Sequence, residues 1–272
     1  MIWSIVWDII WSIYEWDNIK TKDFLLFPNW VFFTDDSVLT LATMYAILNN
    51  KSYWNSYCEF YKKYPWKGYW WKFIEWCDKK PLFWFFKRNQ DSYGNWSAMR
   101  VSPVWYVCDN IEDTLKLAKK TAICTHWHKE WIKWAQAISL AIFYSRKWKN
   151  KDFIRNEIEK RFNYDLSRSL ETIRPNYTFD VTCQWSVPES IISFLESTGF
   201  EDAIRNAISL WWDSDTIACI TWSIAEAYFG IPEDIYKNTI SYLDNDSKEI
   251  INNFYEKYWL KKYWTKKQKE NN

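Results

Sequence analysis

Glycine is scarce in this chain, and tryptophan is correspondingly abundant. The 272 residues include 4 glycines and 23 tryptophans, whereas ordinary usage would supply roughly 19 glycines. Glycine normally supplies positive φ angles and lets a backbone approach a ligand or another backbone closely. The apolar residues recur with helical periodicity, and nothing shows the regular alternation and Asn-Gly turns of an all-β chain. We therefore predict an all-α fold.

Recognisable caps bound many of the predicted helices. Asn110, Asn150 and Asp246 stand where an N-cap side chain would accept a first-turn N–H, and Pro188 and Pro232 suit the first helical position. The predicted helices span Trp3 to Glu15, Asp36 to Asn49, Asn55 to Tyr64, Ser97 to Cys108, Ile111 to Cys124, Glu130 to Arg146, Lys151 to Phe162, Pro188 to Glu196, Phe200 to Ser209, Ser214 to Phe229, Pro232 to Leu243 and Ser247 to Tyr258, with loops at Lys87 to Asn95 and Ile173 to Gln184.

Composition limits the possible partners. The 35 Lys and Arg residues nearly balance the 34 Asp and Glu residues, for a formal charge of +1, so no global field favours nucleic acid or an anionic membrane. No apolar stretch reaches the ~20 residues of a membrane span, and the N-terminus lacks a secretory signal pattern. The basic, aromatic stretch from Lys257 to Lys269 is interpreted as a solvated terminus.

The length suits a single domain with a large core. We expect residues 1–245 to form that domain and residues 246–272 to form a C-terminal helix and basic tail. The 6 cysteines include no C-x-x-C pair, and several fall inside apolar helical patterns, which is typical of buried free thiols in a reducing cytosol. We expect a cytoplasmic protein with no nucleic-acid or membrane partner.

Two acidic motifs lie far apart in the chain, each where an amphipathic helix is predicted to begin. They are Thr34-Asp35-Asp36-Ser37 and Asp213-Ser214-Asp215-Thr216. Each offers two carboxylates and a threonine hydroxyl, the hard oxygen donors that Mg²⁺ or Mn²⁺ prefer. Either motif alone is also an ordinary helix cap. Because crowded carboxylates from two helix starts would repel unless cations held them, the pair indicates a dinuclear metal site at helix N-termini.

Three further motifs accompany the acidic pair. Gly94-Asn95-Trp96-Ser97-Ala98-Met99-Arg100 would lead into a helix N-terminus, where unpaired N–H groups attract a pyrophosphate. In Thr125-His126-Trp127-His128-Lys129-Glu130-Trp131, a zinc interpretation is weak because the chain has only 2 histidines and no cysteine at ligand spacing. Trp11-Ser12-Ile13-Tyr14-Glu15 ends in a carboxylate. Open alternatives are an interior ion pair for Arg100, helix-capping turns for the histidines, and an exposed helix end for Glu15.

These motifs, in this order, resemble those of the ADP-ribosylglycohydrolase family. The family patterns are Thr-Asp-Asp, Asp-x-Asp-Thr, Gly-Asn-Gly-x-x-Met-Arg, Thr-His-x-His-Pro-Glu-Gly and Gly-Ser-x-x-Glu, and here Lys129 replaces the proline. The resemblance covers Ile2 to about Tyr242 and is weak from Lys51 to Asn89. It implies a compact multi-helix bundle with two Mg²⁺ ions (or Mn²⁺) that cleaves the bond between the anomeric ribose carbon of ADP-ribose and a protein side chain or small acceptor.

The resemblance also implies roles for individual residues. Asp8, in Trp7-Asp8 where the family has Gly-Asp, would organise the site, and Glu15 would act as a gate or proton acceptor near the metals. Metal ligation falls to Thr34, Asp35, Asp36, Asp213, Asp215 and Thr216. Catalysis falls to Glu15, Asp35, Asp36 and Asp215, and substrate binding to Gly94, Asn95, Trp96, Ser97, Met99, His126, His128, Trp211 and Trp212.

Tryptophan stands at several positions where the family has glycine, among them Trp96, Trp211 and Trp212. We infer that many of the tryptophans are encoded by UGA codons that the source organism reads as glycine. The codons test this hypothesis directly, because UGG at these three positions would contradict it.

The first predicted helix carries Trp3, Trp7 and Trp11 at i, i+4 and i+8. As glycines, these residues would form a ridge for close helix packing; as indoles, they could form an anchor at a membrane interface. Asp8 and the absence of a Lys/Arg-rich polar face argue against the anchor.

Two other functions stay open at this stage. If positions 96, 211 and 212 are genuine tryptophans, the chain could be a catalytically inactive relative that binds ADP-ribose or a partner, since an indole at position 96 would fill the space where backbone should meet phosphate. A Trp-rich surface could instead stack on sugar rings as a carbohydrate-binding module, although the acidic motifs give that interpretation no support.

Overall fold

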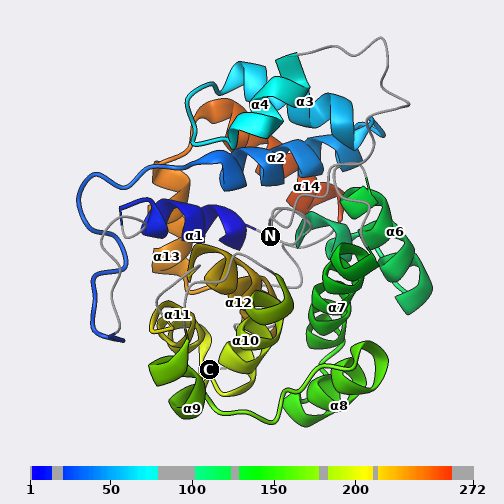
Figure 1. Ribbon diagram of the computed structural model, residues 1–272. Coiled ribbons are helices and arrows are strands. Elements are labelled where there is room, and N and C mark those ends of the chain that lie inside the picture. The colour runs from blue at the N-terminus through cyan, green and yellow to red at the C-terminus, as the bar shows by residue number, and fades with distance from the viewer. Residues whose placement is uncertain are drawn as a thin grey trace.

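The computed structural model describes residues 2–13, 21–78, 102–123, 129–177, 183–210 and 214–258. These residues form thirteen α-helices and one short 3-10 helix, and no strand occurs among them (Figure 1). The predicted all-α fold is confirmed for this part of the chain. The helices are α1 Trp3–Trp11, α2 Asp35–Leu48, α3 Tyr53–Lys63, α4 Trp71–Asp78, η1 Ser102–Tyr106, α6 Ile111–Ile123, α7 Lys129–Arg146, α8 Lys151–Phe162, α9 Leu170–Asn176, α10 Cys183–Leu195, α11 Phe200–Ile208, α12 Ser214–Phe229, α13 Glu233–Ser241 and α14 Asn245–Lys257.

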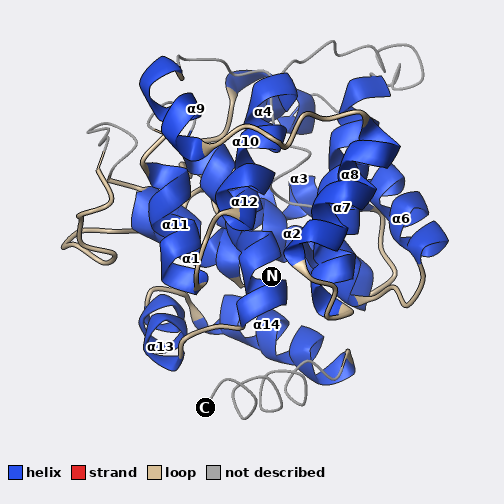
Figure 2. Cartoon of the chain, turned by 90° about the horizontal axis from the view of Figure 1, so that it is seen from below, coloured by secondary structure: helices blue, strands red, loops and turns tan. Residues whose placement is uncertain are grey.

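Helix α12 lies at the centre of the core. Every side chain from Ile217 to Ala227 is buried, which is typical of a helix enclosed on all sides. Helices α1, α7, α10 and α11 pack around it (Figure 2). Trp7 of α1 meets Trp222 of α12 edge to face, with ring centroids 4.9 Å apart. Trp7 therefore belongs to the core, and none of the described helices is long and apolar enough to cross a bilayer.

Helix α2 forms a second layer with α3 and α14, and α1 packs against both α2 and α12. In Figure 1, α2 lies above α1 and α12 lies below it. Helix α1 runs antiparallel to α2, because Thr40 donates a hydrogen bond to the Ser4 hydroxyl at 3.2 Å, while the Ser12 hydroxyl accepts the Phe32 N–H at 3.0 Å. The C-terminal half of α1 is therefore beside the start of α2.

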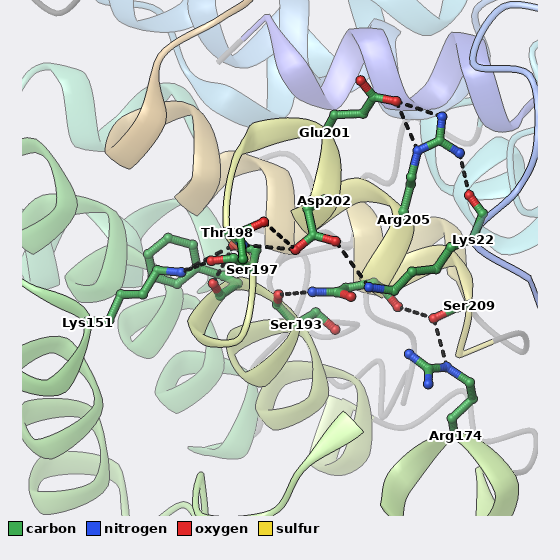
Figure 3. Close-up of polar contacts among 12 residues, drawn as sticks. Lys22, Lys151, Arg174, Ser193, Ser197, Thr198, Glu201, Asp202, Arg205 and Ser209 are labelled. Carbon is green, nitrogen blue, oxygen red and sulfur yellow. Dashed lines mark hydrogen bonds and ion pairs between the residues drawn. The ribbon is translucent and has the colours of Figure 1, made fainter. Parts of the chain in front are cut away.

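The segment that leads into α2 is held by α11 (Figure 3). Arg205 donates to the backbone carbonyls of Lys22 and Phe24 and pairs with Glu201 at 2.6 Å. Lys22 in turn lies 3.1 Å from the carboxylate of Asp202. These contacts join two distant parts of the chain and fix the approach of the backbone to the acidic start of α2.

The starts of α6 and α8 agree with the prediction. Asn110 and Asn150 accept N–H groups three residues later, at 2.8 and 2.9 Å, as predicted. The prediction that Asp246 caps α14 is wrong, because Asp244 accepts the Ser247 N–H at 2.7 Å. Asp246 instead pairs with a lysine of α3 at 2.6 Å. Two carboxylates so close in sequence offer equivalent caps, and tertiary packing selects between them.

Helix α10 corrects a second prediction. It begins at Cys183, so that Pro188 lies inside the helix rather than at its first position. Proline removes a backbone hydrogen bond there, but burial of Ile191, Ile192 and Phe194 outweighs the loss. The segment predicted to be a loop, Ile173 to Gln184, contains the end of α9 and the start of α10. Helix α4 was not predicted. The helix predicted from Ser97 is a 3-10 helix over Ser102–Tyr106 in its described part.

Three tryptophans have backbone conformations that normally require glycine. Trp30, Trp66 and Trp148 have φ angles of 74°, 66° and 60°, in the left-handed region that costs an L-residue roughly 1–2 kcal/mol. Their side chains are 91%, 96% and 52% exposed, so little packing offsets that cost. Elsewhere, the ring centroids of Trp54 and Trp76 are 3.3 Å apart, closer than the usual range of about 4.5–7 Å for aromatic pairs.

Trp148 is the clearest example of a tryptophan in a backbone conformation that suits glycine. It follows the end of α7, where its N–H bonds to the Ser145 carbonyl at 3.2 Å and the Lys149 N–H bonds to the Tyr144 carbonyl at 3.1 Å. This is the Schellman pattern, whose left-handed position is usually glycine and sometimes asparagine. The positive-φ positions after α2, α8 and α12 hold those usual residues, Asn50, Asn163 and Gly230. The backbone therefore supports the hypothesis that some of the tryptophans are glycine in the source organism.

Glycine at Trp30, Trp66 and Trp148 is expected to stabilise the protein. Relief of the left-handed strain should exceed the extra entropy that glycine gives the unfolded chain, for a net gain of about 0.5–1 kcal/mol per site. Denaturant unfolding of each single variant measures the effect. Trp70→Gly is the matched control, because Trp70 is exposed and has no positive φ. Equal effects at Trp70 and at the three sites would contradict the argument.

Candidate active site at the start of helix α2

The first acidic motif forms the N-terminal turn of α2. Thr34 is extended, with φ −114° and ψ −161°, and Asp35 and Asp36 occupy the first turn. Asp36 is buried and Asp35 is half-buried. Carboxylates are favoured at this end of a helix because of the helix dipole. The motif therefore gathers several oxygen atoms that could ligate a metal at the N-terminus of α2, where the helix also has unpaired N–H groups.

Asp8 of α1 holds this turn in place. Its carboxylate accepts the Thr34 N–H at 2.5 Å and the Ser37 N–H at 3.2 Å, and it also accepts the hydroxyl of Thr34. The Thr34 side chain makes no capping bond to α2. Asp8 is thus the capping residue although it belongs to another helix. Its predicted role as the organiser of a catalytic site stays a prediction.

The environment of Asp8 opposes its charge. Burial raises the pKa of Asp8 to about 6, and hydrogen bonds from Ser37 and Thr34 act in the opposite direction. Burial disfavours a carboxylate because water is removed, whereas donors aimed at the oxygens favour it. The hydrogen bonds to α2 are therefore needed to keep this buried acid compatible with the fold.

The connection between α3 and α4 forms a wall beside the acidic turn. Gly68 has φ +89°, and a Cβ placed on it would lie 3.6 Å from the Oδ1 of Asp35. The neighbouring Tyr69 is buried and donates to the Tyr64 carbonyl at 2.9 Å. Burial and the nearby Asp35 raise the pKa of the Tyr69 phenol. The α3–α4 connection, residues 64–70, thus adds no further acid beside Asp35.

Lys67, in the same α3–α4 connection, supplies a positive charge near the acidic turn of α2. Its ammonium lies 3.6 Å from the ring centroid of Phe33. Burial lowers the pKa of Lys67, and the carboxylates of Asp8 and Asp244 oppose that change. Sequence reasoning missed the whole wall, since this segment resembles the family only weakly. Gly68, one of the 4 glycines of the chain, was the available signal.

The donors at the start of α2 fit a hard divalent cation. Thr34, Asp35 and Asp36 offer oxygen atoms only, which Mg²⁺ and Mn²⁺ prefer, and Gly68 leaves the space beside Asp35 free of a side chain. Among the described side chains, no three His, Cys, Asp or Glu residues gather closely enough to hold a metal ion. A complete ligand set would therefore need carboxylates from the second acidic motif.

The second motif begins α12, as predicted. The backbone of Ser214, Asp215 and Thr216 forms the first turn of that helix. The side chains of Asp215 and Thr216 lie outside the described part of the chain, and so do the predicted site residues Glu15, Gly94, Asn95, Trp96, Ser97, Met99, His126, His128, Trp211, Trp212 and Asp213. The structure brings together Asp8 and the first acidic motif, and the meeting of the two motifs stays a prediction.

Comparison with known proteins agrees with this fold. A sequence profile of the family described as ADP-ribosylglycohydrolase matches residues 11–264, so the chain belongs to the ADP-ribosylglycohydrolase family. A solved structure described as an ADP-ribosylglycohydrolase-related protein complex superposes with a TM-score of 0.66 over 93% of this chain and 94% of that chain, at 16% sequence identity. At this identity the structural likeness establishes the fold, and the profile establishes the family.

Loss of the Asp8 carboxylate should destabilise the start of α2. We expect Asp8→Ala to lower the free energy of unfolding by about 2 kcal/mol or more, because two N–H groups at a buried helix start lose their acceptor. Asp244→Ala removes an exposed cap that accepts a single N–H in α14, and should cost roughly 1 kcal/mol. Chemical denaturation at pH 7 compares the two variants. A smaller loss for Asp8→Ala than for Asp244→Ala would contradict the assigned role.

Proposed function

We propose that the protein is an ADP-ribosylglycohydrolase that removes ADP-ribose from a protein side chain or a small acceptor. The bond to be cleaved is the glycosidic bond at the anomeric carbon of the ribose. Membership of the family over residues 11–264 supports this class of reaction. The observation that carries the proposal is the acidic turn of α2, which Asp8 holds through three hydrogen bonds.

We propose that the cofactors are two Mg²⁺ ions, for which Mn²⁺ could substitute. Thr34, Asp35 and Asp36 from α2 would hold them together with Asp213, Asp215 and Thr216 at the start of α12. When bound, such ions supply positive charge that lowers the pKa of a water molecule and stabilises developing negative charge. The oxygen-only donor set at the start of α2 supports this assignment.

Other residues near the start of α2 would position the metal ligands and accept a proton. Asp8 fixes the backbone of Thr34 and Ser37, and thereby the direction in which Asp35 and Asp36 project from α2. Gly68 keeps the space beside Asp35 free of a side chain. Glu15, which follows the helix that carries Asp8, would accept a proton or gate the site.

Binding of the nucleotide part would fall to the loop residues predicted from sequence. The motif from Gly94 to Arg100 would receive the pyrophosphate on backbone N–H groups, and His126 and His128 would line the ligand. The acceptor bears no signature in the described residues, so the substrate class is an ADP-ribosylated protein or a small ADP-ribose conjugate. We propose a cytoplasmic location, because the 6 cysteines of the sequence include no C-x-x-C pair and several fall inside apolar helical patterns.

The tryptophans at positions 96, 211 and 212 distinguish the enzyme from an inactive relative. An indole at these positions would crowd backbone that must approach ligand or metal. The left-handed φ angles of Trp30, Trp66 and Trp148 favour glycine elsewhere in the same chain. We therefore assign activity to the protein that contains glycine at positions 96, 211 and 212, and we expect the tryptophan form to bind poorly or to be inactive.

Release of ADP-ribose from an ADP-ribosylated peptide tests the proposal. The Trp96→Gly, Trp211→Gly, Trp212→Gly variant should be active only with Mg²⁺ or Mn²⁺. Asp36→Asn and Asp215→Asn should each lower kcat/KM at least about 100-fold, or ~2.7 kcal/mol of transition-state stabilisation. Asp109→Asn is the control, because the Asp109 side chain is 93% exposed and makes only a 4.0 Å surface ion pair with Lys147 in the described part of the chain. Activity that survives exhaustive chelation would exclude the metal-dependent reaction, and binding of ADP-ribose without turnover would favour the inactive relative.

A further inference from the structure

Helices α3 and α4 bring two cysteines together. Cys58 on α3 is half-buried and Cys77 on α4 is buried, and their sulfur atoms are 2.7 Å apart. The Tyr61 hydroxyl donates to the carboxylate of Asp78 at 3.3 Å, across the same helix pair. Ring contacts between Tyr61 and Phe73 add to this junction. The two thiols are therefore held face to face by several contacts besides their own.

Two other buried cysteines lie outside this helix pair. Cys108 follows η1, and Cys219 lies inside the central helix α12. They serve as internal references, since they also carry buried thiols.

The two paired sulfurs differ in accessibility. The adjacent Cys58 thiol and burial both raise the pKa of the Cys77 thiol, which keeps Cys77 protonated. Cys58 is the more exposed member, and a peroxide reaches exposed thiols first. Cys58 is thus placed to react with the oxidant, and Cys77 is placed to resolve the product.

We propose that Cys58 and Cys77 form an oxidation-sensitive dithiol that closes to a disulfide on reaction with a peroxide. The deprotonated Cys58 sulfur attacks a peroxide oxygen, the O–O bond breaks, and sulfenic acid and water form. The Cys77 sulfur then attacks the Cys58 sulfur, the S–O bond breaks, and the hydroxide leaves as water with the Cys77 proton. The two sulfurs lose two electrons in total, and the peroxide accepts them.

A disulfide between Cys58 and Cys77 would enclose the α3–α4 connection, which faces the acidic turn of α2, in a covalent loop. Residues between the two cysteines include Gly68, whose missing Cβ would lie 3.6 Å from Asp35. A disulfide between residues of a loop restricts the conformations of that loop, chiefly in its unfolded ensemble. Oxidation should therefore protect the Tyr64 to Trp70 connection against local opening. This consequence does not depend on the proposed enzymatic activity.

Peptide mapping of the full chain after treatment with hydrogen peroxide tests the proposal. Under non-reducing conditions we expect a crosslinked peptide pair that contains Cys58 and Cys77, and two fewer titratable thiols. Cys58→Ser and Cys77→Ser should each abolish the crosslink. Cys108→Ser and Cys219→Ser should leave its yield unchanged. In the oxidised protein, proteolytic cleavage between Tyr64 and Trp70 should be slowed several-fold, and dithiothreitol should reverse the effect.

A separate measurement guards against variants that fail to fold. In Cys77→Ser, a sulfenic-acid probe such as dimedone should label Cys58, because no resolving thiol remains. In the unaltered chain such labelling should be weak. Irreversible oxidation of Cys58 without a crosslink, or crosslinks distributed among all the cysteines, would overturn the proposal.

Discussion

The structure of the candidate site depends on one buried carboxylate. Asp8 lies near the end of α1, between the central helix α12 and the layer formed by α2, and it accepts two N–H groups and one hydroxyl from the start of α2. A buried acid is costly unless donors surround it. Because these donors come from the acidic motif, the helix that completes the core also sets the position of the carboxylates of α2.

Contacts on either side of α2 also restrict the position of its acidic start. The segment before α2 is tied to α11 by Arg205 and by the pair of Lys22 with Asp202. On the other side, Gly68 brings the α3–α4 connection against Asp35 without a side chain between them. Helix α1 and the α3–α4 connection thus meet at the start of α2. The function we propose uses that convergence to hold charged groups in a fixed array.

Sequence alone was sufficient for features whose cause is local. The starts of α6 and α8 were predicted because Asn110 and Asn150 stand at strong N-cap positions. The acidic motifs were found because residue types and spacing carry the chemistry. The competition between Asp244 and Asp246, the burial that keeps Pro188 inside α10, and the approach of Gly68 to Asp35 all depend on tertiary packing. No local pattern contains that information. Trp30, Trp66 and Trp148 are a different case, since their positive φ angles are ones that glycine or asparagine usually adopts.

The most direct test of the central claim is the position of the metal ions. Crystals of the Trp96→Gly, Trp211→Gly, Trp212→Gly variant grown with Mn²⁺ would give an anomalous difference map. The account predicts two peaks, each within about 2.0–2.3 Å of carboxylate oxygens, with ligands from both Asp36 and Asp215. A map with no peak at the start of α2, or with Asp36 and Asp215 on separate faces of the molecule, would contradict the account.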